Sequence, residues 1–161
     1  HGSKRMTDVI VIRAASEEDL DFIRGLVPSL LEFGSPLWQD PSGLASPFNQ
    51  VLARAVQEQN ANTAVLVAEA ADDTRLGFIS VRVVEDPVTG GKRVHVADLA
   101  VTPAAHRTGV GRALMSAGES WAHDRGAAIV TLDVWSTNHR ALDFYRALGF
   151  STESLSLAKR L

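Results

Sequence analysis

The sequence predicts one mixed α/β domain in which a mostly antiparallel sheet also contains a parallel pair of strands. Hydrophobic periodicity switches between strand-like and helix-like segments in the order β, α, α, β, β, β, α, β, α, β. Three consecutive strand-like segments are joined by short turns, which favours antiparallel neighbours. A helix-like segment then separates residues 94–101 from residues 127–135. These two strands are therefore expected to run parallel.

The first third of the chain predicts a strand at residues 7–14, then two helices. Ser16 is the expected N-cap of the first helix, because acidic residues follow it at the positive end of the helix dipole. Pro28 lies inside the apolar pattern of this helix and predicts a kink or a break there. The pattern consists of Leu20, Ile23, Val27 and Leu30. After a loop rich in Pro, Gly and Ser, Ser46 and Pro47 are expected as the N-cap and first residue of the second helix. Its predicted apolar face contains Val51, Leu52, Ala55 and Val56.

The rest of the chain predicts five strands and two helices. Gly126 and Gly149 stand where a helix usually ends in a left-handed residue, and Asn138 is the expected cap of the last helix. A turn at residues 71–74 joins the first two of these strands. The strands are expected at residues 63–70, 76–85, 94–101, 127–135 and 150–157.

Composition limits the class of protein before any motif is considered. With 161 residues and 45% hydrophobic content, residues 6–161 are expected to form a single domain with its own core. Residues 1–5 precede Met6 and are interpreted as an expression remnant; without Lys4 and Arg5 the formal charge moves from -3 to -5. An acidic domain is a poor nucleic-acid binder. No apolar run approaches eighteen residues, so we expect no membrane partner and a cytoplasmic protein.

The chemistry is expected around a strand, a loop and a helix start that follow one another. The strand at residues 94–101 is apolar except for the carboxylate of Asp98 and the imidazole of His95. Gly109 and Gly111 then open a helical pattern, where small residues let a ligand approach the backbone. The first amides of a helix have no internal partner and lie at the positive end of its dipole. This turn therefore predicts a phosphate or pyrophosphate site.

Two other glycine motifs compete for this turn. A Walker A loop requires Lys and then Ser or Thr after its second glycine, and here Arg112 and Ala113 follow Gly111. The dinucleotide fingerprint is matched in part, because its third glycine would fall on Leu114, while Asp133 lies about twenty residues further on, as a ribose-binding acid should. Only about fifty residues follow the turn, which is short for the remainder of a dinucleotide-binding sheet.

Two segments resemble the GNAT superfamily of acyltransferases. The run His106-Arg107-Thr108-Gly109-Val110-Gly111 is similar to the family's pyrophosphate loop, although His106 stands where Gln or Arg is usual. The run N-H-R-A-L-D-F-Y-R-A-L-G-F at residues 138–150 resembles the family's last helix with its tyrosine, Tyr145. The resemblance covers residues 76–150 well and the first seventy residues only loosely.

The resemblance implies a GNAT-like fold with a splayed parallel strand pair and helices on both faces of a twisted sheet. It also implies acetyl transfer from acetyl-CoA to the primary amine of an unidentified acceptor. A non-catalytic module that senses acyl-CoA is the alternative, and a dinucleotide-binding oxidoreductase is a third. The family often has one more strand than this chain, which leaves a sheet edge that a second copy could cover as a homodimer. There is no cysteine, and the histidines show no metal-ligand spacing, so no metal is expected.

The resemblance assigns expected cofactor contacts residue by residue. The pyrophosphate would lie on the backbone amides of the glycine turn, and the pantothenate chain would add to the preceding strand like a short extra strand. A backbone N–H of that strand would also hold the thioester carbonyl. The expected cofactor-binding residues are Leu99, Ala100, Val101, Arg107, Thr108, Gly109, Val110, Gly111, Arg112, Asn138 and Tyr145.

Tyr145 and Asp98 are the two candidate catalytic groups. A tyrosine with a pKa near 10 stays protonated at neutral pH and is able to donate a proton to the departing thiolate; alternatively Tyr145 is a half-buried core aromatic. Asp98 in an apolar strand is a candidate base for the amine, acting through water, or else a structural carboxylate. Strand alternation places His95, a weaker candidate base, on the face opposite Asp98. Glu69, Asp133 and Trp135 either line the acceptor pocket or only stabilise strands.

Overall fold

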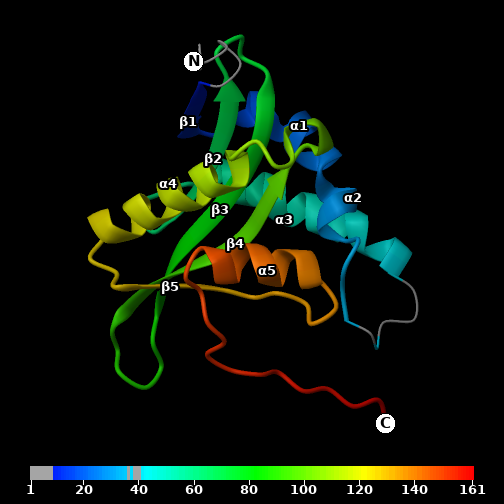
Figure 1. The fold of residues 1–161 in the computed structure, drawn as a ribbon, viewed down its shortest axis with the longest axis vertical. Coiled ribbons are helices and arrows are strands. Elements are labelled where there is room, and N and C mark those ends of the chain that lie inside the picture. Colours follow the sequence, from blue (N-terminus) through cyan, green and yellow to red (C-terminus); the bar gives the residue numbers. More distant parts are fainter. Residues whose placement is uncertain (1–8, 36, 38–40) are drawn as a thin grey trace.

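The computed structural model describes residues 9–35, 37 and 41–161. Within these residues one five-stranded sheet has the spatial order β1-β2-β3-β4-β5 (Figure 1). The expected expression remnant at residues 1–5 and the start of the expected first strand lie outside the described residues, as does Trp38 in the loop rich in Pro, Gly and Ser. The strands are β1 (Ile10–Ala14), β2 (Thr63–Ala70), β3 (Arg75–Glu85), β4 (Lys92–Val101) and β5 (Ile129–Leu132).

The predicted mixture of antiparallel and parallel strands is confirmed. β1, β2, β3 and β4 pair antiparallel in chain order, and β4 pairs parallel with β5. A six-residue loop, residues 86–91, connects β3 to β4, whereas α4 (Val110–Asp124) lies in the connection from β4 to β5. This sheet is not the parallel sheet of a dinucleotide-binding domain, so the topology argues against the oxidoreductase alternative.

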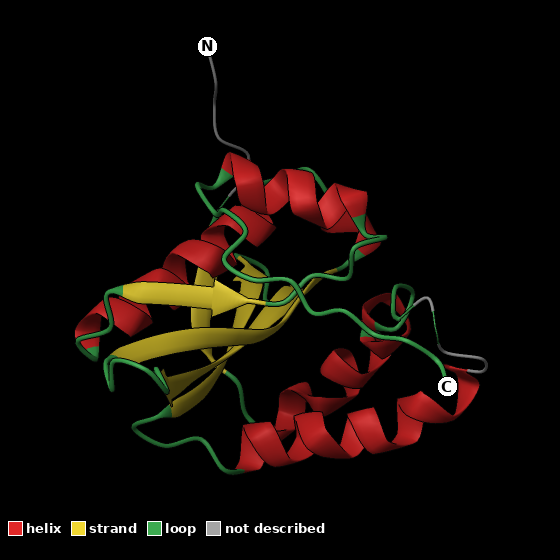
Figure 2. Ribbon diagram, turned by 90° about the horizontal axis from the view of Figure 1, so that it is seen from below, coloured by secondary structure: helices red, strands yellow, loops and turns green. Residues whose placement is uncertain are grey.

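Helices cover both faces of the sheet (Figure 2). One core cluster contains the buried side chains of α4, and α5 (His139–Ala147) packs onto it through its aromatic residues. The opposite cluster contains Ile23, Val27, Leu52 and Val56. These come from the remaining α-helices, α1 (Leu20–Gly25), α2 (Val27–Leu30) and α3 (Ala45–Gln57). The 3-10 helices are η2 (Glu17–Asp19), η3 (Pro41–Leu44) and η4 (Pro103–Ala105).

The early helices follow the predicted pattern with two differences. The first helix is broken at Leu26, as the proline at position 28 predicted, because Pro28 has no N–H to continue the ladder. The helix start predicted at Ser46 and Pro47 is wrong, since α3 begins at Ala45, directly after η3. In its predicted apolar face, Leu52 and Val56 are buried, whereas Val51 is 58% exposed.

The strand predicted at residues 150–157 is absent from the described residues. Residues 151–161 form an extended, fully exposed segment without a strand partner. Two contacts hold this segment, an ion pair from Arg93 to Glu153 at 2.6 Å and a hydrogen bond from Arg160 to the carbonyl of Leu37. The strand predicted at residues 127–135 is also shorter than expected, because only Ile129–Leu132 pairs with β4. In residues 127–135 the apolar pattern therefore extends beyond the paired strand, and in residues 150–157 it has no partner strand among the described residues.

A buried carboxylate joins the first turn of helix to the sheet. Both oxygens of Asp19 accept hydrogen bonds from Arg13 on β1, at 2.8 Å each, and one also accepts from Nε of Arg75 on β3 at 2.6 Å. The backbone N–H of Ser16 donates to the same carboxylate, and Glu69 on β2 pairs with Arg13. Asp19 is fully buried. These contacts, Arg13 first, hold the pKa of Asp19 well below its usual range.

We predict that Asp19→Asn lowers the free energy of unfolding by about 2 to 3 kcal/mol at neutral pH. Removing one partner from a buried ion pair leaves the other charges uncompensated, and the partial exposure of the two arginines reduces the loss. Because the pKa of Asp19 is depressed on folding, its contribution is complete at neutral pH and is lost as the pH falls below about 4. Urea unfolding of both proteins at several pH values measures this.

Asp21→Asn is the matched control, because Asp21 lies two residues further on and is fully exposed. We expect it to change stability by less than about 0.5 kcal/mol. If the two variants were equally stable at neutral pH, the buried carboxylate would not be the connection described above.

Candidate active site

β4 and β5 part in the middle of β4. The parallel pairing runs from Arg93 opposite Ile129 to Val96 opposite Leu132, and β5 ends there. β4 continues to Val101 with β3 as its neighbour on one side only, among the described residues. We call residues 97–101 the open edge of β4. The splayed parallel pair that the resemblance implied is therefore present.

A β-bulge lies where the strands part. Ser80 pairs with Asp98 and Val81 pairs with Val96, so Ala97 is an extra residue without a partner on β3. A bulge of this kind bends the strand and increases its twist. It therefore accounts physically for the departure of β4 from β5 at this level.

Backbone alternation determines which amides the open edge presents. The N–H of Thr102 donates to the carbonyl of Leu76 on β3 at 2.9 Å. Because successive N–H groups of a strand point to opposite edges, the N–H groups of Leu99 and Val101 point away from β3. Of the three expected contacts on this strand, the backbones of Leu99 and Val101 face the opening, whereas that of Ala100 faces β3.

The glycine turn connects the open edge to the start of α4. Gly109 is the N-cap, with φ of +88°, and the helix has no side-chain cap. Arg107 also has a positive φ, +62°, which is rare for a residue with a side chain. The first amides of α4, from Val110 to Arg112, precede the first helical hydrogen bond, from Ala113 to the Gly109 carbonyl at 3.0 Å. An uncapped helix start that follows two left-handed residues is the geometry expected for an anion site.

Two residues of the turn have structural roles that the motif did not reveal. A Cβ added to Gly111 would lie 3.3 Å from the ring of Phe144 on α5, so this glycine permits close helix packing rather than approach of a ligand. The Nε2 of His106 lies 3.1 Å from the carbonyl of Val101. His106, the departure from the family motif, thus connects the turn to the last residue of β4.

The bulge reverses which face each side chain of β4 occupies. Before it, Val94 and Val96 are buried in the cluster that contains α4. After it, Leu99 packs against the same cluster, and Ala100 belongs to the opposite one. Even-numbered residues therefore change face at Ala97, because a bulge inserts one residue into the alternation.

His95 and Asp98 consequently point to the same face of the sheet, the face that α1, α2 and α3 cover further along. The prediction that they lie on opposite faces is wrong, because it assumed an unbroken alternation. Ser80 donates a hydrogen bond to Asp98 at 3.0 Å. Burial raises the pKa of Asp98, and this hydrogen bond opposes the rise. Burial also lowers the pKa of His95. Ser80 was missed, although it is the single hydroxyl in the apolar run F-I-S-V.

Tyr145 and Asn138 lie on and before α5. Tyr145 is half-buried, with edge-to-face contacts to Phe144 at 5.1 Å and Phe150 at 5.7 Å between ring centroids. Burial raises the pKa of Tyr145 to about 12. The Oδ1 of Asn138 accepts a hydrogen bond from the N–H of Ala141 at 3.1 Å, so the predicted cap is confirmed. The amide nitrogen of Asn138 keeps its capacity to donate.

The remaining candidates divide between the two alternatives left open by the sequence. Glu69 belongs to the ion-pair cluster of Asp19, which gives it a structural role. Asp133 is almost fully exposed and lies 3.4 Å from Nε2 of His95. Trp135 is 43% exposed. Arg107 and Arg112, which flank the glycines, are exposed.

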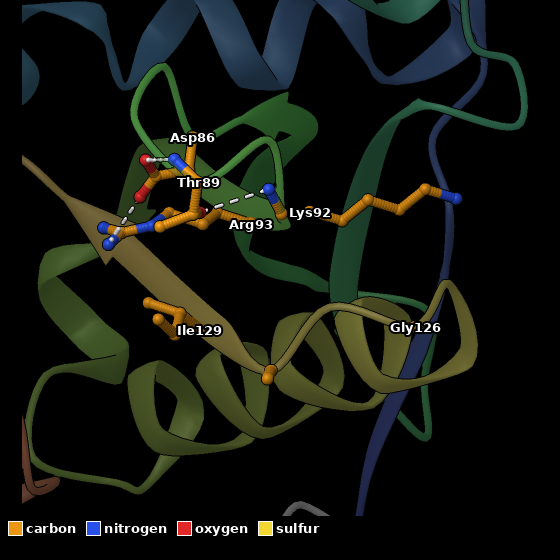
Figure 3. A pocket seen from close by; sticks show the side chains of 8 residues that line it. Asp86, Thr89, Lys92, Arg93, Gly126 and Ile129 are labelled. Atoms are coloured by element: carbon orange, nitrogen blue, oxygen red, sulfur yellow. Dashed lines mark hydrogen bonds and ion pairs between the residues drawn. The ribbon is translucent and has the colours of Figure 1, made fainter.

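A hollow of about 320 Å³ lies at the other end of the β4–β5 pair (Figure 3). Arg93 is directed toward Asp86 across it, while Lys92 extends away. Gly126 and Ile129 form its opposite side. Four residue steps of strand, roughly 13 Å at 3.3 Å per residue, separate Arg93 from Ala97, where the open edge begins. None of the residues that line this hollow belongs to the open edge or to the glycine turn.

Within residues 9–35, 37 and 41–161, no group of three or more His, Asp or Glu side chains is arranged to hold a metal ion. Among the helices of that same part of the chain, none is both long and apolar enough to cross a membrane.

Comparisons with known proteins agree with this geometry. The chain matches the model of the acetyltransferase (GNAT) family over residues 30–150. It is 32% identical over 126 residues to aminoglycoside N(6')-acetyltransferase type 1 of Klebsiella aerogenes. The aligned residues make up 76% of this chain and 82% of that one. It is 33% identical over 125 residues to mycothiol acetyltransferase of Rhodococcus erythropolis, 75% of this chain and 34% of that one.

Solved structures show the same fold. A putative acetyl transferase from Pyrococcus furiosus superposes with a TM-score of 0.76 at 23% identity, over 95% of this chain and all of that one. AAC(6')-Iy in complex with a bisubstrate analogue of coenzyme A superposes with a TM-score of 0.69 at 22% identity, over 95% of this chain and 98% of that one. The family model, the curated relatives and the splayed sheet together show that this chain belongs to the GNAT family of acetyltransferases.

Proposed function

We propose that the protein transfers an acetyl group from acetyl-CoA to the primary amine of an acceptor molecule. The observation that supports this most is the juxtaposition of two features that are consecutive in the chain. The open edge of β4 offers unpaired backbone groups, and the uncapped start of α4 follows it within nine residues. One ligand with an amide-containing chain and a diphosphate has the chemistry to use both.

The residues present fit the pantetheine chain and diphosphate of coenzyme A. The amides of Val110 to Arg112 are donors for the diphosphate, and the exposed cations Arg107 and Arg112 add favourable charge. The N–H groups of Leu99 and Val101 and the carbonyl of Leu99 are available to amide groups that extend the sheet, whereas His106 already contacts the Val101 carbonyl. Bound in this way, acetyl-CoA supplies an activated acyl carbonyl. An N–H of the open edge is then a donor for the oxyanion that forms on it.

In this proposal Asp98 is the base, and Tyr145 assists the leaving group by a hydrogen bond. Asp98 accepts a proton from the incoming ammonium group, through water, and burial favours a pKa closer to neutrality than that of an ordinary aspartate. Tyr145 remains protonated at every assay pH, because its pKa is about 12, and donates a hydrogen bond to the departing thiolate. Edge-to-face contacts with Phe144 and Phe150 orient the ring of Tyr145.

Two experiments distinguish this proposal from its alternatives. Thiol release from acetyl-CoA is measured with a panel of primary amines, because a module that only senses acyl-CoA does not turn over. The panel begins with aminoglycosides, since relatives more than 30% identical carry that name. Melting temperatures are then compared with coenzyme A and with NAD, because a ligand that binds the native state raises the melting temperature. A shift with NAD alone would support the oxidoreductase instead.

We predict that Gly109→Asp binds coenzyme A at least about thirtyfold more weakly than Gly109→Asn. Asn and Asp both tolerate a left-handed conformation and have nearly the same shape, so the two variants differ by one negative charge beside the diphosphate. An acid at a helix N-cap favours folding, so the weaker binding cannot be attributed to loss of structure. Calorimetric titration with coenzyme A measures both. Equal affinities would mean that no anion binds at this turn.

We predict that Tyr145→Phe lowers kcat about tenfold and leaves the KM for acetyl-CoA unchanged. The phenylalanine keeps the edge-to-face packing on Phe144 and Phe150, so only the hydroxyl is removed. The expected loss is smaller than the roughly 10² to 10⁴-fold of a full proton-transfer group, because Tyr145 donates only a hydrogen bond to the thiolate. Steady-state rates at several pH values provide the measurement, and unchanged turnover throughout would remove Tyr145 from the mechanism.

We predict that Asp98→Asn lowers kcat/KM about 10² to 10⁴-fold without loss of stability. Because folding raises the pKa of Asp98, ionisation of this carboxyl costs folding free energy above its ordinary pKa, so its removal leaves the melting temperature at neutral pH unchanged or higher. A structural carboxylate predicts the reverse, a lower melting temperature with activity retained. Kinetics and thermal melting on the same preparation separate the two roles, and Ser80→Ala is the control for loss of the hydrogen bond alone.

A further inference from the structure

The face of the sheet next to Asp98 carries a continuous set of polar groups that the proposed mechanism does not yet use. Arg82 pairs in register with His95, and His95 pairs in register with Thr131. Asp133 follows two residues after Thr131 and lies level with the bulge, because Leu132 is opposite Val96. We call His95, Thr131 and Asp133 the polar row.

Both ring nitrogens of His95 have partners in the polar row. Its Nδ1 lies 2.8 Å from the hydroxyl of Thr131, and its Nε2 lies 3.4 Å from a carboxylate oxygen of Asp133. The side chain of His95 is only 16% exposed, whereas that of Asp133 is 96% exposed. The row therefore connects a group beside the proposed base with a carboxylate in solvent.

Position along the strands brings the row close to Asp98. The bulge turns His95 and Asp98 to one face. Their partners on β3 are Arg82 and Ser80, so only the Val96–Val81 pair lies between them along the sheet. The charge of each influences the other, since the pKa of His95 is raised by Asp98 and the pKa of Asp98 is lowered by His95, both as minor contributions. Without the bulge the sheet itself would separate these two side chains.

The reaction itself creates a need for such a connection. As the ammonium nitrogen forms its bond to the acyl carbon and the carbon–sulfur bond breaks, that nitrogen loses two protons. One proton ends on the sulfur of coenzyme A, and the other must reach the solvent in every turnover. In the proposed mechanism Asp98 receives the second proton, and Asp98 is half-buried. It has to pass this proton on before the next acceptor binds.

We infer that His95 is a positioning residue that relays this proton from Asp98 to solvent, with Thr131 and Asp133 holding its ring in place. The inference rests on the proposed function. The Nδ1–H of His95 donates to the hydroxyl oxygen of Thr131, which leaves Nε2 as the acceptor. Nε2 takes the proton from Asp98, through water, and releases it to the exposed end of the row. Asp133 stabilises the imidazolium that forms in passing, as a carboxylate does for a catalytic histidine.

The other charges near His95 are compatible with a transient imidazolium. Arg82 on β3 opposes it, and this residue is exposed, so solvent screens its charge. Arg93, two residues earlier on β4, is neutralised by Asp86 and Glu153 at 2.9 and 2.6 Å. Burial keeps the resting imidazole neutral, which is the state that accepts a proton.

The test compares His95→Gln and His95→Ala with His123→Gln, an exposed histidine on α4. We expect His95→Gln to lower kcat about tenfold, less than loss of the base itself, with the KM for acetyl-CoA unchanged. The deficit in kcat should grow toward acid pH, because Asp98 loses its proton most slowly there. Imidazole added to the assay should restore most of the kcat of His95→Ala, because a small base replaces the missing ring. His123→Gln should match the unmodified protein with and without imidazole.

Each result has a defined meaning. Equal kcat and equal pH profiles for His95→Gln and the unmodified protein, or no response of His95→Ala to imidazole, would overturn the relay. If His95→Ala does not fold, Asp133→Asn carries the test, because its side chain is in solvent; about a threefold loss of kcat is expected, and an unchanged kcat counts against the inference. Failure of the unmodified protein to release thiol with any amine would instead reject the proposed function.

Discussion

The site depends on one departure from regular strand geometry, the extra residue Ala97 in β4. It bends β4 away from β5, so that residues 97–101 keep an open edge directly before the glycine turn. It also exchanges the two faces of the strand, which turns Asp98 toward the side where His95 and Thr131 lie. A regular strand of the same composition would stay paired with β5 and would direct Asp98 into the cluster beneath α4. The open edge of β4 and the placement of the candidate base thus have a single physical cause.

The two halves of the sheet have different tasks. β1, β2 and β3 are joined to the first helical turn by Asp19, whose buried carboxylate gathers Arg13, Arg75 and the Ser16 amide. Such a cluster contributes specificity of arrangement more than net stability, because burying its charges costs nearly as much as their attraction returns. This half of the sheet holds β3, which is the partner strand of the bulge and carries Ser80, the hydrogen-bond donor to Asp98. β4 therefore stays paired with β3 on both sides of the bulge while it parts from β5.

Sequence patterns predicted those parts of the molecule that depend on local chemistry. Gly126 and Gly149 have positive φ after their helices, and Asn138 caps α5, because capping involves only neighbouring residues. The last strand was predicted at residues 150–157, where Leu155 and Leu157 alternate with serine, but pairing needs a partner strand, and the local sequence contains no information about one. The bulge was missed for the same reason, since Ala97 is unremarkable in sequence and its register is set by β3. The face occupied by His95 followed from that error.

The electrostatics of the site explain why two candidate proton-transfer groups occupy a sheet this apolar. Burial raises the pKa of both Asp98 and Tyr145, but this favours proton transfer to Asp98 and disfavours proton transfer from Tyr145. For Asp98 the rise makes the carboxylate a stronger base toward an ammonium group, whereas for Tyr145 it makes the hydroxyl a weaker acid and a hydrogen-bond donor that never ionises. In the proposed reaction we therefore expect these two groups to assist removal of a proton from nitrogen more than departure of the sulfur. A thiolate is a stable leaving group near neutral pH, so abstraction from the amine is the step at which we expect the residues to have most effect.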